Sequence, residues 1–152
     1  MENLNVVFYS KDKKINPDLF SKDAELWAEK ICNAGLKIKI DPKTKKEKKV
    51  LEKNKISQIR KFYDEVLRFS NLLKAGENYQ SIFPYIKMLN AKVVYAEGRN
   101  LVTREFTTFI KQSLEQLKED DLQTFHIFEN FFEAFMGYYR FYESQYKGEG
   151  EQ

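Results

Sequence analysis

The stretch from Asp121 to Gln145 constrains this chain most, because it is apolar on more than one side of a single long helix. Nine of its 25 residues are Phe or Tyr. At 1.5 Å per residue it would form a helix about 37 Å long. Its apolar side chains recur at three- and four-residue steps, the spacing of a helix.

These apolar positions form two stripes on the expected helix. One stripe comprises Leu122, Phe125, Phe128, Phe132, Phe135, Tyr139 and Tyr142, and the other comprises Ile127, Phe131, Ala134, Tyr138 and Phe141. The narrow polar line between them comprises His126, Glu129, Asn130, Glu133, Gly137 and Arg140. A helix that is apolar over most of its girth must be covered by other helices or by a second chain.

The rest of the sequence favours a single all-α domain. The 152 residues, of which 42% are hydrophobic and 32% charged, are enough to bury a core, and only three Pro and six Gly interrupt the chain. We therefore predict a helical bundle of about five helices built around the aromatic helix. Because one chain offers few helices to cover that helix, we also expect self-association, as a homodimer in isolation.

Helix start and stop signals divide the chain further. Asn16-Pro17 is expected to begin a first helix that ends at Gly35, and a second helix is expected from Lys53–Ile56 to Ala75. Ser81 is expected to cap a third helix, so that Pro84 falls in its first turn, and Gly98 is expected to separate it from a fourth. Three other segments are expected to lie outside the helices: an arm or short strand at 1–16, a basic linker at 36–54 and a frayed tail at 147–152.

Charge is distributed unevenly along the chain. Residues 36–55 carry nine lysines and three acids, whereas residues 111–152 carry four bases and nine acids. This asymmetry suggests a polyanion on one side of the protein. The linker lysines are expected to lie on no fixed face, so that any nucleic-acid contact there would be loose. A mobile solvated loop is the alternative interpretation.

A stripe on the third helix combines cations with aromatic rings. Tyr85, Met88, Lys92, Tyr95 and Arg99 share one face at helical spacing. Cations neutralise phosphates while rings stack on bases, so the combination suits single-stranded nucleic acid. Such residues at the edge of a bundle also snorkel without binding anything, which is the competing interpretation.

Catalytic and metal-binding patterns are missing from the sequence. With one His and one Cys, a metal site would need carboxylates, and neither an HExxH motif nor a glycine-rich phosphate loop occurs. His126 is expected to face solvent, and Asp120-Asp121 to cap the last helix; a nuclease that uses these three residues is a competing hypothesis. We therefore expect no enzyme, no cofactor and no metal site. With neither a signal peptide nor an apolar span, we expect a cytoplasmic protein.

Three segments together resemble a known family. They read ISQIRKFYDEV at 56–66, MLNAKVVYAEGR at 88–99 and FENFFEAFMGYYRFY at 128–142. The set is similar to the small subunit of the type III-A CRISPR effector, the Csm complex. The resemblance implies a small, all-helical, non-catalytic subunit that lies in several copies beside the subunits holding the guide RNA. It implies contact with guide and target RNA through backbone and shape, together with contacts to other subunits of the effector.

The resemblance also implies where RNA would be contacted. It favours RNA binding by the mixed stripe, including Tyr95. Five cations in the three matching segments are then expected to bind phosphates: Arg60, Lys61, Lys92, Arg99 and Arg140. The alternative is a helical protein–protein adaptor that does not bind RNA.

Overall fold

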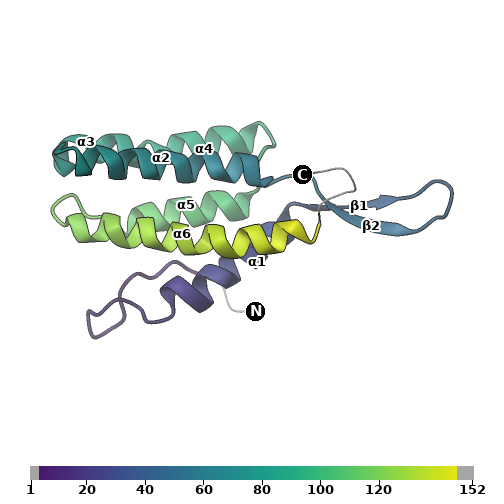
Figure 1. Ribbon diagram of the computed structural model, residues 1–152, viewed down its shortest axis with the longest axis horizontal. Helices are drawn as coiled ribbons and strands as arrows, with labels where there is room; N and C mark the ends of the chain where they lie inside the picture. The colour runs from purple at the N-terminus through teal and green to yellow at the C-terminus, as the bar shows by residue number, and fades with distance from the viewer. Residues whose placement is uncertain (1–3, 147–152) are drawn as a thin grey trace.

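The computed structural model describes residues 4–146, so the tail expected at 147–152 lies outside the described residues. The chain is mostly helical, as predicted (Figure 1). A short π-helical turn, η1 (Leu19–Asp23), leads into the first of six α-helices. The α-helices are α1 (Ala24–Ala34), α2 (Ile56–Lys74), α3 (Tyr79–Lys87), α4 (Leu89–Gly98), α5 (Arg104–Glu115) and α6 (Leu122–Ser144).

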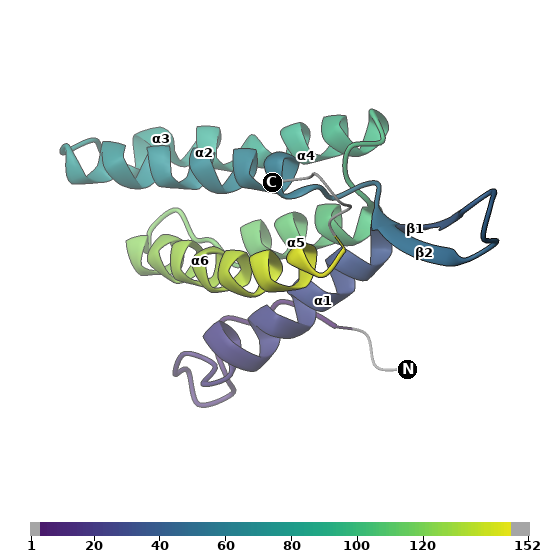
Figure 2. The same ribbon diagram turned by 45° about the vertical axis from the view of Figure 1, so that its right-hand side comes forward.

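The helices form three layers. Helices α5 and α6 lie side by side in the middle layer, with α2, α3 and α4 on one side and α1 on the other (Figures 1 and 2). Contacts of α6 with both α1 and α2, and of α5 with both α1 and α4, agree with this arrangement. The middle layer therefore buries two faces.

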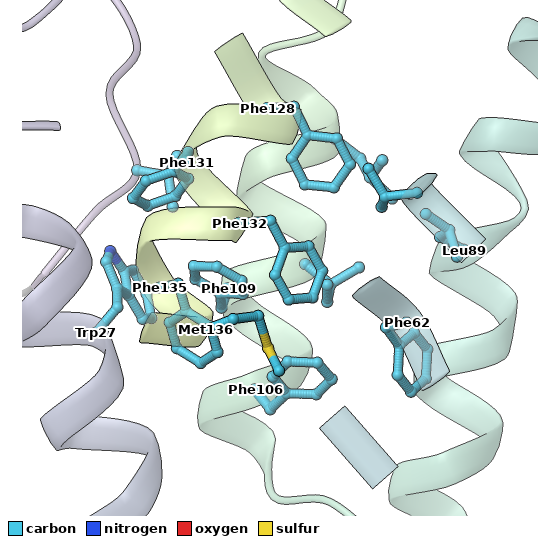
Figure 3. Packing of buried hydrophobic residues seen from close by; sticks show 14 of the residues in the cluster. Trp27, Phe62, Leu89, Phe106, Phe109, Phe128, Phe131, Phe132, Phe135 and Met136 are labelled. Atoms are coloured by element: carbon cyan, nitrogen blue, oxygen red, sulfur yellow. The ribbon is translucent and has the colours of Figure 1, made fainter. Parts of the chain in front are cut away.

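The core is centred on Phe109 of α5, which is fully buried. Its ring is stacked on Phe135, with the centroids 4.5 Å apart. Three further rings have centroids within 5.3–5.5 Å of it: Phe131, Phe132 and Trp27. We call the layer of α2, α3 and α4 the outer layer. Figure 3 shows Trp27 on one side of the α6 rings, and Phe62 and Leu89 of the outer layer on the other. Trp27 is thus a core residue.

The chain covers the aromatic helix by itself. Six rings of α6 are fully buried among the described residues: Phe125, Phe128, Phe131, Phe132, Phe135 and Tyr139. The polar line stays accessible. Phe141, which belongs to the second apolar stripe, is 58% exposed as well. One chain therefore has enough helices to cover α6. The expectation of self-association rested on too few covering helices, so the homodimer stays a prediction without that support.

Asn78, and not Ser81, caps the third helix. The Asn78 side chain accepts a hydrogen bond from the Ser81 backbone N–H at 3.0 Å, and α3 begins at Tyr79. Pro84 therefore lies inside α3, where it has no N–H to donate to the preceding turn. The helix ends soon afterwards, and α4 starts at Leu89. The single helix expected up to Gly98 is consequently divided in two.

The N-terminal segment is packed against the bundle. Phe8 is fully buried, its ring 6.2 Å from that of Phe131, and its N–H donates to Gln116 Oε1 at 3.2 Å. The N–H of Val6 likewise donates to Gln112 Oε1 at 2.8 Å. From Leu4 onwards, this segment is therefore no free arm. Helical structure begins at Leu19, which is buried, whereas the next residue, Phe20, is exposed.

The prediction of a linker at 36–54 was wrong. Strands β1 (Leu36–Ile40) and β2 (Glu47–Leu51) form an antiparallel ribbon that extends beyond the helices (Figures 1 and 2). The alternation of apolar residues and lysines along β1 fits a strand. Asp41 Oδ1 closes the turn by accepting from the N–H of Lys43 at 2.8 Å, and Lys45 takes a left-handed φ of 61°. Hence the fold is helical with one small sheet.

Asn54 ties the base of the ribbon to three helices. It is fully buried with a left-handed φ of 59°, which Asn tolerates better than most residues. Its amide nitrogen donates to the carbonyl of Ile31 at 2.9 Å and to Thr103 Oγ1 at 2.7 Å, and its Oδ1 accepts from the Thr103 N–H at 2.8 Å. The Tyr139 hydroxyl donates to the Asn54 carbonyl. The ends of α1 and β2, the start of α5 and the middle layer therefore meet at this residue.

We predict that Phe109→Ala lowers the free energy of unfolding by about 3–5 kcal/mol, because it empties the centre of the aromatic core. Phe141→Ala removes the same ring from an exposed position of α6 and is expected to change stability by about 0.5 kcal/mol or less. Urea denaturation followed by circular dichroism measures both. Equal losses would show that burial of Phe109 is not what stabilises the core.

We predict opposite effects for Ala at two glycines. A Cβ at Gly35 would lie 2.1 Å from the carbonyl oxygen of Lys53, so Gly35→Ala forces backbone apart and should destabilise by about 1–3 kcal/mol. A Cβ at Gly137, inside α6, meets no atom within 4 Å among the described residues. Gly137→Ala should therefore stabilise by about 0.5–1 kcal/mol. Thermal melts of the two variants test the difference in sign.

Candidate nucleic-acid interface

A groove of about 220 Å³ runs between α2 and α4 in the outer layer. Its floor is apolar and includes Phe62 and Ala96, which are largely buried, and Leu101. Phe62 is held in place by an edge-on contact with Phe106 of α5, with the ring centroids 5.3 Å apart. The floor thus belongs to the core, and the groove is a stable feature of the outer layer.

The groove brings together four of the six residues predicted to bind RNA. Lys61 lies on α2, Lys92 and Tyr95 lie on α4, and Arg99 is the residue that follows α4 as its C-cap. Tyr95 is 67% exposed, and the Arg99 guanidinium lies 5.6 Å from the centre of its ring. A cation over a ring holds both groups in place, so this pair presents a charge and an aromatic face together.

Glu65 is the acidic member of the groove. Its Oε2 lies 3.0 Å from Arg68 Nη2 and 3.8 Å from Lys92 Nζ, so the carboxylate bridges α2 and α4. All three side chains are partly accessible, and such ion pairs contribute about 0–1 kcal/mol each. A competing anion can therefore displace Glu65 from Lys92 at little cost.

The aromatic stripe of the predicted third helix survives its division into α3 and α4. Tyr85, Met88, Lys92 and Tyr95 are all exposed, at 59%, 48%, 46% and 67% respectively. Met88, the residue between the two helices, keeps an almost helical backbone, with φ −63° and ψ −17°. The stripe is consequently continuous along the outer layer and borders the groove.

Two predicted residues lie elsewhere. Arg60 is exposed on α2 but does not line the groove. Arg60 lies three residues before Tyr63 on α2, and its positive charge opposes the rise that burial causes in the pKa of the Tyr63 hydroxyl. No ion pair joins Arg60 to Asp64 in the described structure. Arg140 is exposed on α6, in the middle layer, and also lies outside the groove.

Two residues of the nuclease hypothesis, His126 and Asp121, have partners within α6. His126 is exposed, as predicted, with Nδ1 3.7 Å from Glu129 Oε1. Asp121 caps α6 by accepting from the N–H of Gln123 at 3.1 Å, again as predicted.

Cys32 is a buried free cysteine. Burial is the main cause, and the charge of Glu143 the second, that raises the pKa of its thiol to about 11. Cys32 therefore carries no thiolate near neutral pH.

Neither a cluster of metal-binding side chains nor a membrane-spanning helix occurs among the described residues. Within residues 4–146, no three His, Cys, Asp or Glu side chains are grouped closely enough to hold a metal ion. None of the described helices combines the length and the apolar character that crossing a bilayer requires.

Reasoning from sequence missed Glu65 and the groove floor. The contact of Glu65 with Lys92 joins two helices across 27 residues, and no local spacing reveals such a pair. The neighbouring pair with Arg68 is separated by three residues, so helical periodicity could have identified it. Phe62 is apolar in the sequence, but the residues that lie above it depend on how α4 packs against α2.

Comparison with known proteins identifies the family. The family model Csm2 Type III-A matches residues 36–145, which include the ribbon, the groove and all of α6. Searches of curated proteins and of solved structures gave no match. The matched segment covers most of the chain and contains all three segments on which the resemblance rested. The chain therefore belongs to the Csm2 type III-A family, the small subunit of the type III-A CRISPR effector complex.

Proposed function

We propose that this protein is a non-catalytic subunit that contacts the backbone of the guide or target RNA without reading its sequence, and that it links neighbouring subunits of the effector. The observation that carries the proposal is the groove between α2 and α4. It combines three cations, an exposed tyrosine and an apolar floor on one surface. A groove of this composition is typical of surfaces that follow a single strand of nucleic acid.

Each groove residue has a distinct part in the proposed contact. Arg99 offers a planar fork that grips a phosphate by two hydrogen bonds, whereas Lys61 and Lys92 act as point charges. Tyr95 offers a ring on which any base stacks, independent of sequence. In an RNA-guided complex, base pairing between guide and target supplies the specificity, so the protein needs no contacts that read bases.

Glu65 would exchange partners when RNA binds. In the free protein it neutralises Lys92 and Arg68, two cations on adjoining helices. A phosphate that approaches Lys92 replaces this carboxylate and gains a charge-assisted hydrogen bond. Glu65 thereby lowers the affinity of the groove for RNA, and it keeps the two helices aligned when RNA is absent.

A protein–protein adaptor without RNA binding is the second candidate. The exposed apolar side chains of Met88 and Val94, both about half exposed on the outer layer, favour it. The two functions differ in their response to salt. Binding to RNA phosphates weakens steeply as the salt concentration rises, and an adaptor has no RNA affinity to lose.

We predict that the full chain binds labelled single-stranded RNA without sequence preference, and that the double variant Lys92→Ala, Arg99→Ala binds it more weakly. For single strands, each lost phosphate contact lowers the slope of log K against log salt by about 0.7, so the expected decrease is about 1.4. Fluorescence anisotropy across a salt series measures both affinity and slope.

The matched control for this groove variant is Lys11→Ala, Lys14→Ala. It removes the same charge from exposed positions of the N-terminal segment, outside the groove. Circular dichroism checks that helicity is unchanged in both proteins. Equal weakening by groove variant and control would mean that only net charge matters, and parent-like binding by the groove variant would place the RNA site elsewhere.

We also predict that Glu65→Gln strengthens RNA binding and steepens its salt dependence, because Lys92 and Arg68 lose the carboxylate that neutralises them. The same anisotropy measurement tests this. Unchanged or weaker binding would contradict the proposed competition between Glu65 and phosphate.

A further inference from the structure

The β1–β2 ribbon gathers three of its lysines on one face. Its register places Lys39 directly opposite Lys48, and Lys37 opposite Val50. Directly paired residues share a face, as do residues two apart along a strand, so Lys37, Lys39 and Lys48 cluster on one face. We call this cluster the lysine face. Ile38 and Ile40, 54% and 61% exposed, lie on the other face, which we call the apolar face. Their cross-strand partners, Lys49 and Glu47, lie on that face too.

The lysine face keeps a charge repulsion that the ribbon does not neutralise. Like charges directly opposite each other destabilise an antiparallel pair. Lys37 is compensated by Glu52, with Nζ and Oε2 3.1 Å apart. Lys39 and Lys48, by contrast, form no ion pair within the described part of the chain. An external anion would relieve this repulsion.

The other acids of the ribbon are placed away from the lysine face. Glu47 is paired with Ile40 and therefore shares the apolar face. Asp41 is engaged by the turn, where hydrogen bonds from the N–H groups of Lys43 and Thr44 lower the pKa of its carboxyl. The turn adds three further exposed lysines: Lys43, Lys45 and Lys46.

We infer that the lysine face and the turn of the ribbon bind the phosphate backbone of RNA, as a second contact separate from the groove. This inference rests on the proposed function, namely that the chain contacts RNA. Residues 36–51 include no Arg, Asn, Gln or aromatic residue, so the ribbon carries charge without groups suited to reading or stacking bases. The ribbon extends beyond the helices (Figures 1 and 2). The groove, by contrast, lies between α2 and α4.

The arrangement of the two faces favours nucleic acid over a lipid surface. A segment that lies on a membrane needs its apolar side chains in the acyl region, with basic residues beside them at the headgroups. Here Ile38 and Ile40 point away from the lysine face, where Val50 is an apolar residue that is only partly exposed. On the side of the isoleucines, Glu47 offsets the charge of Lys49, so that face lacks the net basic charge that anionic headgroups attract. Compact, strongly hydrated lysines are suited to phosphates that remain in water.

The double variant Lys39→Gln, Lys48→Gln tests the inference in the full chain. Gln is a neutral polar residue that removes the repulsion between the strands, so loss of binding cannot be ascribed to an unfolded ribbon. Anisotropy with single-stranded RNA across a salt series should give a slope shallower by about 1.4, for two lost phosphate contacts. The matched control, Ile38→Thr, Ile40→Thr, changes only the apolar face and should bind as the parent does.

The groove variant Lys92→Ala, Arg99→Ala separates this inference from the proposed function. If the ribbon variant binds like the parent while the groove variant is weakened, the ribbon contact is overturned and the groove is supported. The reverse result supports the ribbon and overturns the groove. Equal loss in the lysine and isoleucine variants contradicts the assignment to the lysine face. Binding to vesicles of phosphatidylserine and phosphatidylcholine, without binding to RNA, overturns both RNA contacts in favour of a lipid surface.

Discussion

The burial of aromatic rings on both sides of the α5–α6 layer is the constraint on which the rest of the structure depends. Phe109 contacts rings of α6 and Trp27 of α1, while Phe62 of α2 closes the opposite side against Phe106. Such a layer needs cover on both faces, so the remaining helices must form two outer layers. The groove exists because α2 and α4, which cover one face, leave their own outer sides to solvent.

A second requirement is that the buried polar backbone at the layer junction be hydrogen-bonded. Asn54 meets it with a left-handed backbone and an amide that satisfies groups from α1 and from the start of α5. Gly35 allows the carbonyl of Lys53 to approach closely. Together these residues determine where the β1–β2 ribbon leaves the helices. They also set the start of α2, and thus the position of Lys61 relative to α4.

The basic surfaces are only partly neutralised by the protein itself, and this connects structure to the proposed function. Glu65 shields Lys92 in the groove, and Glu52 shields Lys37 in the ribbon. Both are accessible pairs that cost little to break. The charges therefore remain available to an external polyanion. Under the proposed function, that polyanion is RNA.

The sequence by itself determined the helical class, the covered aromatic helix, the solvent-facing His126 and the stripe that contains Lys92 and Tyr95, since helical periodicity is a local property. Only the tertiary structure decided that Lys61 would join that stripe while Arg60 and Arg140 would not, because the grouping depends on how separate helices pack. The tertiary structure also decided that a single chain is enough to cover α6. The ribbon was missed because the lysine-rich composition obscured its two-residue alternation, and the faces of a strand are defined only once its partner and register are known.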